Sequence, residues 1–123
     1  MILSDYRPQI EAALAYEGGA HTYEDVVNAV DAGEAQAWYG PRSIVITQID
    51  EQPRRKILHF FLAGGDMKEL EAMTDGILRW GDDQGCTVAR LVGRKGWTRS
   101  FLARTGWTDT QLVVMEKPIN VTR

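Results

Sequence analysis

The sequence has few of the residues that build cross-links, metal clusters or membrane segments. Among its 123 residues there are one cysteine, Cys86, and two histidines. An internal disulfide and a cysteine-based metal cluster are therefore excluded. No apolar run approaches the ~18 residues that cross a bilayer. The first residues contain neither a basic segment nor an apolar run of signal length. We therefore expect a cytoplasmic protein that holds no metal and does not insert in a membrane.

Acidic residues are absent from one stretch, between Cys86 and Thr108. The net charge of the whole chain is −3, which disfavours general binding of nucleic acid. The local patch suits a ligand that carries phosphate, and a solvated helix face is an equal alternative. A nucleic-acid-binding module built on this patch is the least favoured interpretation. The basic residues of the stretch are Arg90, Arg94, Lys95, Arg99 and Arg104.

The pattern of apolar and turn residues predicts one α/β (α+β) domain over residues 1–123. Apolar residues make up 44% and charged residues 25% of the chain, as in ordinary globular proteins. We divide the domain into N-terminal helices (1–33), a sheet with crossover helices (34–117) and a tail (118–123). Helices are predicted over 5–17, 22–33, 66–85 and about 97–105, and strands over 35–39, 43–49, 56–63, 87–92 and 111–115.

The strand at 56–63 is predicted to be central, because it is apolar on both faces. Strict alternation places Leu58, Phe60 and Leu62 on one face. The strand at 87–92 should run parallel to it, since a crossover helix joins the two. The sequence therefore predicts a mixed central sheet with helices packed on its faces.

The junction after the central strand is the most informative local feature. The strand ends abruptly at Gly64-Gly65, and Asp66 then begins a helix as its N-cap. Glu69 lies three positions further on, as the partner in a capping-box-like pair. A strand that breaks at glycines before a capped helix can present backbone N–H groups to an anion.

This order of elements resembles the GNAT superfamily of acetyl-CoA-dependent N-acyltransferases over roughly residues 22–117, in a truncated form. The resemblance implies that the junction loop binds the pyrophosphate of acetyl-CoA or of another acyl-CoA. The Gly106-Trp107 pair is similar to the family's Gly-aromatic pair after the last helix. The residues of the implied cofactor loop are Leu62, Ala63, Gly64, Gly65, Asp66 and Met67.

Two residues of the basic stretch are further candidates for cofactor binding. Arg94 can contact coenzyme phosphates, or it can belong to a protein interface. Trp97 can stack on an adenine, or it can anchor a helix start in the core.

The chain departs from the family pattern at three places. The loop carries the acid Asp66 and lacks the family's leading Gln or Arg. A carboxylate at a helix start competes with a pyrophosphate for the same positive end. Leu102 stands where the family often has a Tyr that protonates the departing thiolate, and Leu cannot donate a proton. There is room for one strand after the last helix, where the family usually has two.

Acyl transfer to an amine needs a base and an oxyanion donor. His59 on the central strand is the candidate base, and a packed histidine is the alternative. The backbone N–H of Leu62 or Ala63 is the candidate oxyanion donor if the strand splays there. His21, in a loop, is interpreted as incidental, and Cys86 as a buried structural thiol.

The chain is also similar to short GNAT-like proteins of bacteriophages and prophages. The similar segments are Tyr-Arg-Pro-Gln-Ile-Glu at 6–11 and Gly-Arg-Lys-Gly-Trp at 93–97. Two functions follow as expectations. One is an acyl-CoA-dependent N-acyltransferase with a degenerate cofactor loop. The other is a non-catalytic phage-related assembly protein, with a protein partner or a second copy of itself, and with virion association as a further expectation.

Overall fold

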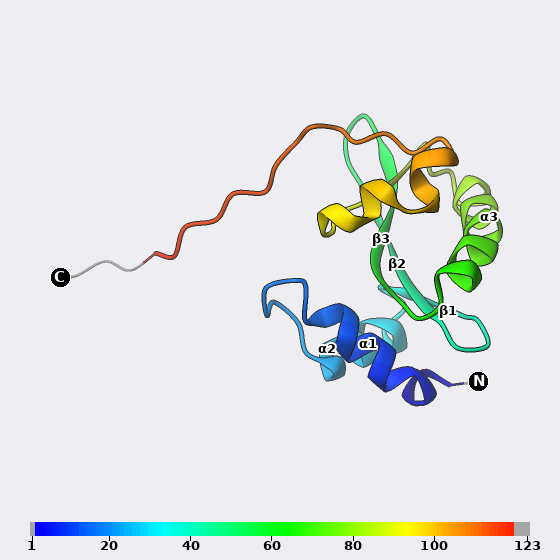
Figure 1. Cartoon of the computed structure of the whole chain (residues 1–123), viewed down its shortest axis with the longest axis vertical. Helices are drawn as coiled ribbons and strands as arrows, with labels where there is room; N and C mark the ends of the chain where they lie inside the picture. Colours follow the sequence, from blue (N-terminus) through cyan, green and yellow to red (C-terminus); the bar gives the residue numbers. More distant parts are fainter. Residues whose placement is uncertain (1, 120–123) are drawn as a thin grey trace.

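The computed structural model describes residues 2–119, which form a four-stranded mixed sheet with helices on both faces, as predicted (Figure 1). The strand order is β1-β2-β3-β4; the first two pairings are antiparallel and β3–β4 is parallel. The strands are β1 (Gln36–Tyr39), β2 (Ile44–Glu51), β3 (Lys56–Gly64) and β4 (Val88–Leu91). The helices are α1 (Arg7–Leu14), α2 (Tyr23–Asp31) and α3 (Met67–Asp83), with 3₁₀ turns η1 (Leu3–Tyr6), η2 (Lys95–Arg99) and η3 (Phe101–Arg104). Among the residues described, no helix is long and apolar enough to cross a membrane.

Two helices begin at the predicted capping residues. Thr22 accepts a hydrogen bond from the backbone N–H of Asp25, whose carboxylate accepts one from Thr22 N–H in return. Asp66 accepts from the N–H groups of Lys68 and Glu69, at 2.9 and 3.2 Å. The predicted return bond, in which the Asp66 backbone N–H would donate to the Glu69 carboxylate, does not form, because this N–H donates to Ser43 Oγ. The Glu69 carboxylate instead binds the loop between β1 and β2, because Ser43 and Arg42 offer it better donors there.

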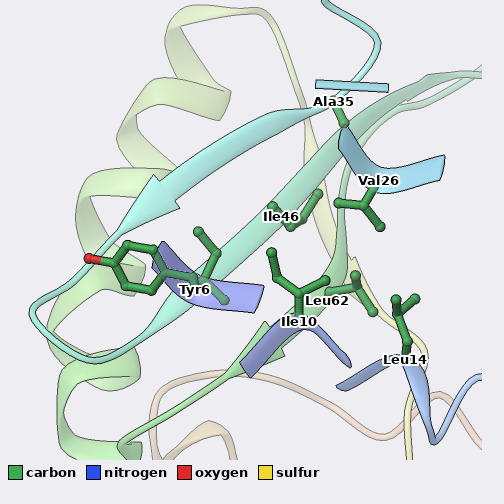
Figure 2. Packing of buried hydrophobic residues seen from close by; sticks show 8 residues of the cluster. Tyr6, Ile10, Leu14, Val26, Ala35, Ile46 and Leu62 are labelled. Atoms are coloured by element: carbon green, nitrogen blue, oxygen red, sulfur yellow. The ribbon is translucent and has the colours of Figure 1, made fainter. Parts of the chain in front are cut away.

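The core is divided by the sheet into two apolar clusters. On one face, α1 and α2 pack against β2 and β3 around Ile10, which is fully buried (Figure 2). On the other face, α3 and the turns η2 and η3 pack around Leu58, Phe60 and Ile77. The two helical layers are visible on opposite sides of the sheet in Figure 1. The strands β2 and β3 contribute to both clusters and are therefore the centre of the fold.

A register shift in β3 overturns the predicted alternation of its side chains. Ile46 pairs with Leu62, but the next residue of β2, Thr47, pairs with Phe60, so Phe61 has no partner on β2. Such a bulge adds one residue to a strand and re-aims the side chains beyond it. Leu62 consequently joins the cluster beneath α1 and α2, whereas Leu58 and Phe60 join the cluster beneath α3.

The C-terminal part differs from the prediction in two ways. The helix predicted over 97–105 is two separate 3₁₀ turns, because Ser100 is extended (ψ −171°) and interrupts it. The strand predicted over 111–115 does not form, because the segment does not reach the open side of β4 and pairs with no strand within the described part of the chain. Residues 108–119 instead run away from the sheet (Figure 1). The tail predicted at 118–123 lies outside the described residues from position 120 onward.

The two glycines at the end of β3 are required by packing. A Cβ on Gly64 would lie 2.6 Å from the carbonyl oxygen of Gln9 in α1. Gly65 has a φ of +127°, and a Cβ there would lie 2.5 Å from Ser43 Oγ. Both distances are shorter than van der Waals contact. The end of β3 is thus pressed between α1 and the β1–β2 loop, with no room for a side chain.

We predict opposite effects of alanine at three glycines. Gly64→Ala and Gly65→Ala should each lower the free energy of unfolding by about 1–3 kcal/mol, because a backbone atom must move. Gly76→Ala, in α3 where the added methyl meets nothing, should raise it by about 0.5–1 kcal/mol. Urea unfolding of the three variants checks this. Stable Gly64→Ala and Gly65→Ala variants would show that the glycines have a role other than packing.

Candidate functional site: a cleft between β3 and β4

A cleft opens where the pairing of β3 with β4 stops. The last paired residues are Phe60 and Leu91, but β3 continues for four residues to Gly64. The chain after β4 turns away toward η2, so residues 61–64 have no partner strand on this side within the described part of the chain. The resulting cleft has a volume of about 280 Å³. Its walls are residues 60–65, residues 91–94 with Trp97, and the α1 side through Ala12, Ala13, Tyr16 and Glu17.

The structure brings together most, and not all, of the residues predicted to bind a cofactor. Arg94 and Trp97 lie on the wall opposite β3, although Trp97 also packs into the cluster beneath α3. Asp66 and Met67 do not line the cleft. Four members of the predicted loop do line it, namely Leu62, Ala63, Gly64 and Gly65.

The resemblance implied that the N-terminus of α3 binds a pyrophosphate, but this end of the helix is already occupied by the protein's own groups. The Asp66 carboxylate already accepts from two of the first N–H groups of the helix. The backbone N–H of Asp66 itself donates to Ser43 Oγ, at 2.9 Å. Three amides at this end, of Asp66, Lys68 and Glu69, are therefore satisfied within the protein, and a carboxylate occupies the positive end of the helix. Any ligand of this cleft must bind its phosphates elsewhere.

Glu69 holds the β1–β2 loop against α3. Its Oε1 accepts from the Arg42 N–H (2.8 Å) and the Ser43 hydroxyl (2.7 Å), and its Oε2 accepts from Arg42 Nε (3.1 Å). The hydroxyl bond from Ser43, followed by the Arg42 backbone bond, lowers the pKa of the Glu69 carboxyl. Because Arg42 is largely exposed, its ion pair contributes less than the hydrogen bonds do.

His59 lies on β3 opposite Arg90 and one pairing before the cleft begins. It is half-buried, and its ring centre lies 6.5 Å from that of Phe61, which does line the cleft. Burial lowers the pKa of the imidazole, Arg90 lowers it further, and Asp50 opposes them. The lowered pKa favours the neutral ring, the form that a base needs, but His59 does not line the cleft.

His21, interpreted from the sequence as incidental, contacts two residues that line the cleft, Glu17 and Phe61. His21 Nδ1 lies 2.9 Å from Glu17 Oε2, and the backbone N–H of His21 donates to Glu17 Oε1. Glu17 lines the cleft, and the His21 ring packs edge-on against Phe61 at 4.9 Å. The only available signal was the four-residue spacing of the pair. The pair lies beyond the end of α1 at Leu14, and the intervening Gly18 and Gly19 are both at positive φ, so the spacing does not indicate a helix.

Arg94 closes one end of the cleft by stacking on Tyr16. Its guanidinium carbon lies 4.0 Å from the centre of the Tyr16 ring, so the pair joins the α1 wall to the wall formed by residues 91–94. Such a contact contributes roughly 0.5–1 kcal/mol when it is exposed. Arg94 is a cation in the cleft with no carboxylate bound to it among the ion pairs of residues 2–119.

The remaining candidates lie away from the cleft. Cys86 is partly buried, and desolvation raises the pKa of its thiol, which opposes a nucleophilic role. Leu102 is buried in the cluster beneath α3 and serves packing. Within residues 2–119, no three His, Cys, Asp or Glu side chains meet in an arrangement that could hold a metal ion.

We predict that Glu69 makes the free energy of unfolding depend on pH. Its pKa is lowered below the usual 4.5 on folding, so it stabilises the fold above that value and loses this contribution as the pH falls through its folded pKa. Glu69→Gln should therefore be less stable than the wild type at pH 7, and the difference should shrink below about pH 4. Urea midpoints measured across pH 3–7 check this, with the exposed Glu34→Gln as control. A constant difference at all pH values would contradict the assignment.

Comparison with known proteins identifies the fold. No protein-family model matches the sequence, and no curated protein matches it. The structure matches wild-type TTHA1254 from Thermus thermophilus with a TM-score of 0.64 and 12% identity, over 99% of this chain and 96% of that chain. It matches the aminoglycoside N-acetyltransferase AAC(6')-Iy, solved with CoA, with a TM-score of 0.71 and 11% identity, over 94% and 88%. A probable acetyltransferase matches with a TM-score of 0.66 and 5% identity, over 99% and 97%. The chain therefore has a GNAT-like fold, as its sequence predicted.

Proposed function

We propose that the chain binds an acyl-CoA in the cleft between β3 and β4 and transfers the acyl group to an amine, with a reduced contribution from the pyrophosphate. The observation that carries this proposal is the end of β3–β4 pairing at Phe60 and Leu91, four residues before β3 ends. An unpaired strand edge inside a cleft offers backbone donors and acceptors to an extended amide-containing chain such as pantetheine. The likeness to an acetyltransferase solved with CoA supports the same ligand.

The charges around the cleft favour phosphate binding on one wall and oppose it at the N-terminus of α3. Asp66 caps α3 and opposes phosphate there, whereas Arg94 on the opposite wall is a cation without a carboxylate partner among residues 2–119. We therefore place the coenzyme phosphates on the Arg94 side, after release of its contact with Tyr16. Residues 61–64 would align the pantetheine arm, and the N–H of Leu62 or Ala63 would stabilise the oxyanion.

A base is needed to take the proton of the attacking ammonium. His21 is the candidate that we favour, because Glu17 orients its Nδ1 and its ring packs on Phe61, and both of these partners line the cleft. A carboxylate on one ring nitrogen selects the tautomer whose other nitrogen accepts a proton. His59, the candidate from the sequence, is a neutral base two residues before Phe61 and is the alternative.

A second function is favoured by a specific observation, the occupied N-terminus of α3. If the cleft does not bind acyl-CoA, the fold serves as a scaffold for assembly, in the phage-related setting that the sequence similarity suggested. Leu102, buried where the family has a proton-donating Tyr, also supports this alternative. The binding experiment below separates the two functions.

We predict that acetyl-CoA at about 100 times its dissociation constant stabilises the protein by ~2.7 kcal/mol and raises its unfolding midpoint by several degrees. Asp66→Asn should bind acetyl-CoA more tightly, because asparagine caps the helix equally well and removes the negative charge that opposes phosphate at the N-terminus of α3. Asp82→Asn, with the same charge change at the far end of α3, should not. Thermal unfolding at millimolar acetyl-CoA measures this, and unchanged midpoints in all three proteins would refute acyl-CoA binding.

We predict that His21→Gln lowers kcat/KM by about 10²–10⁴-fold and leaves acetyl-CoA binding unchanged. His59→Gln serves as the matched control and should change kcat/KM less. The measurement is release of the CoA thiol from acetyl-CoA with a panel of primary amines, including spermidine and aminoglycosides. A large loss in His59→Gln with none in His21→Gln would reverse the assignment of the base.

A further inference from the structure

The C-terminal segment has the sequence of a buried strand but no partner strand within the described residues. It holds four consecutive apolar residues, Leu112 to Met115, whose exposures are 83%, 77%, 72% and 87%. Two of them are β-branched valines, which favour strands. Four exposed apolar residues in a row are a liability in a soluble domain, because they favour association. The segment is therefore expected to be covered by another surface.

The sheet has an open edge at β4, which could accept such a strand. The order β1-β2-β3-β4 leaves one side of β4 without a strand within the described part of the chain. The residues of β4 are half-buried, and Val92, directly after it, is 58% exposed. An edge of this kind presents unpaired N–H and C=O groups to any available strand.

The start of the segment packs in the same apolar cluster as the end of β4. The Trp107 ring contacts Phe60, at 5.5 Å between centres, and Phe60 pairs with Leu91 at the end of β4. A local turn follows, in which the Asp109 carboxylate accepts from Gln111 N–H and Gln111 has a φ of +64°. Beyond the turn the chain leaves the body and continues away from its own sheet (Figure 1).

We propose that residues 111–116 of one copy add as a strand to the open edge of β4 in a second copy, and that the exchange is reciprocal. The direction of the segment is the argument for a second copy, because pairing with its own β4 would need the chain to fold back on itself. A two-fold arrangement satisfies both edges with the same contact and closes the assembly at a dimer. It also covers the apolar run and pairs the backbone of β4 in a single step.

The inference is independent of acyl-CoA binding, and its test needs no ligand. In a Cys86→Ser background, one population carries Arg90→Cys on β4, and a second carries Val113→Cys or Val114→Cys. Neighbouring strand residues point to opposite faces, so one of the two tail positions shares a face with Arg90. After mixing, refolding and oxidation, we expect a disulfide between the two populations and a dimer in sedimentation equilibrium.

Tyr39→Cys on β1, the other edge of the sheet, replaces Arg90→Cys as the matched control and should give no cross-link above background. Val113→Pro should weaken the dimer at least about tenfold, because proline removes a strand hydrogen bond, whereas Val113→Thr should preserve it. Three results would each overturn the proposal: a monomer at all concentrations, a cross-link only within one chain that carries both cysteines, or a cross-link to Tyr39→Cys in place of Arg90→Cys.

Discussion

The unequal pairing of β3 with its two neighbours is the constraint on which the rest of the structure depends. β3 pairs with β2 along its whole length, through a bulge at Phe61, but with β4 only as far as Phe60. The bulge turns Leu62 toward α1 and α2, which ties the N-terminal helices to the centre of the sheet. The loss of pairing on the other side opens the cleft. One strand thus supplies both the core of the fold and the floor of its candidate site.

Packing and ligand binding compete for the same few backbone groups at the end of β3. Gly64 and Gly65 let Gln9 and Ser43 approach within contact of the backbone, and Asp66 and Glu69 satisfy the donors of the α3 N-terminus and of the β1–β2 loop. The chain thus uses these donors internally. Arg94 on the opposite wall has no carboxylate partner among residues 2–119, and we propose it as the cation that attracts an anion into the cleft.

The open edge of β4 follows from the same short sheet. A four-stranded sheet whose last strand is parallel to its neighbour buries both helical layers, yet within residues 2–119 it leaves the hydrogen-bonding groups of that strand unpaired on one side. The C-terminal segment carries the apolar, β-branched residues that such an edge needs, but it leads away from its own sheet (Figure 1). The proposed assembly would therefore complete the sheet by pairing the open side of β4.

The sequence by itself determined the element types and most of their bounds as far as β4, the parallel β3–β4 pair and the helix caps at Thr22 and Asp66, because these depend on local periodicity and capping chemistry. Tertiary structure alone decided the position of Phe61 in a bulge, the bond of Glu69 to Ser43 and the meeting of Glu17 and His21 with the cleft. These contacts join residues whose spacing carries no periodic signal, and they are set by how three layers fit together. The 111–115 segment shows the limit of what the sequence can determine, because its residues favour a strand but a strand forms only when a neighbouring edge pairs with it.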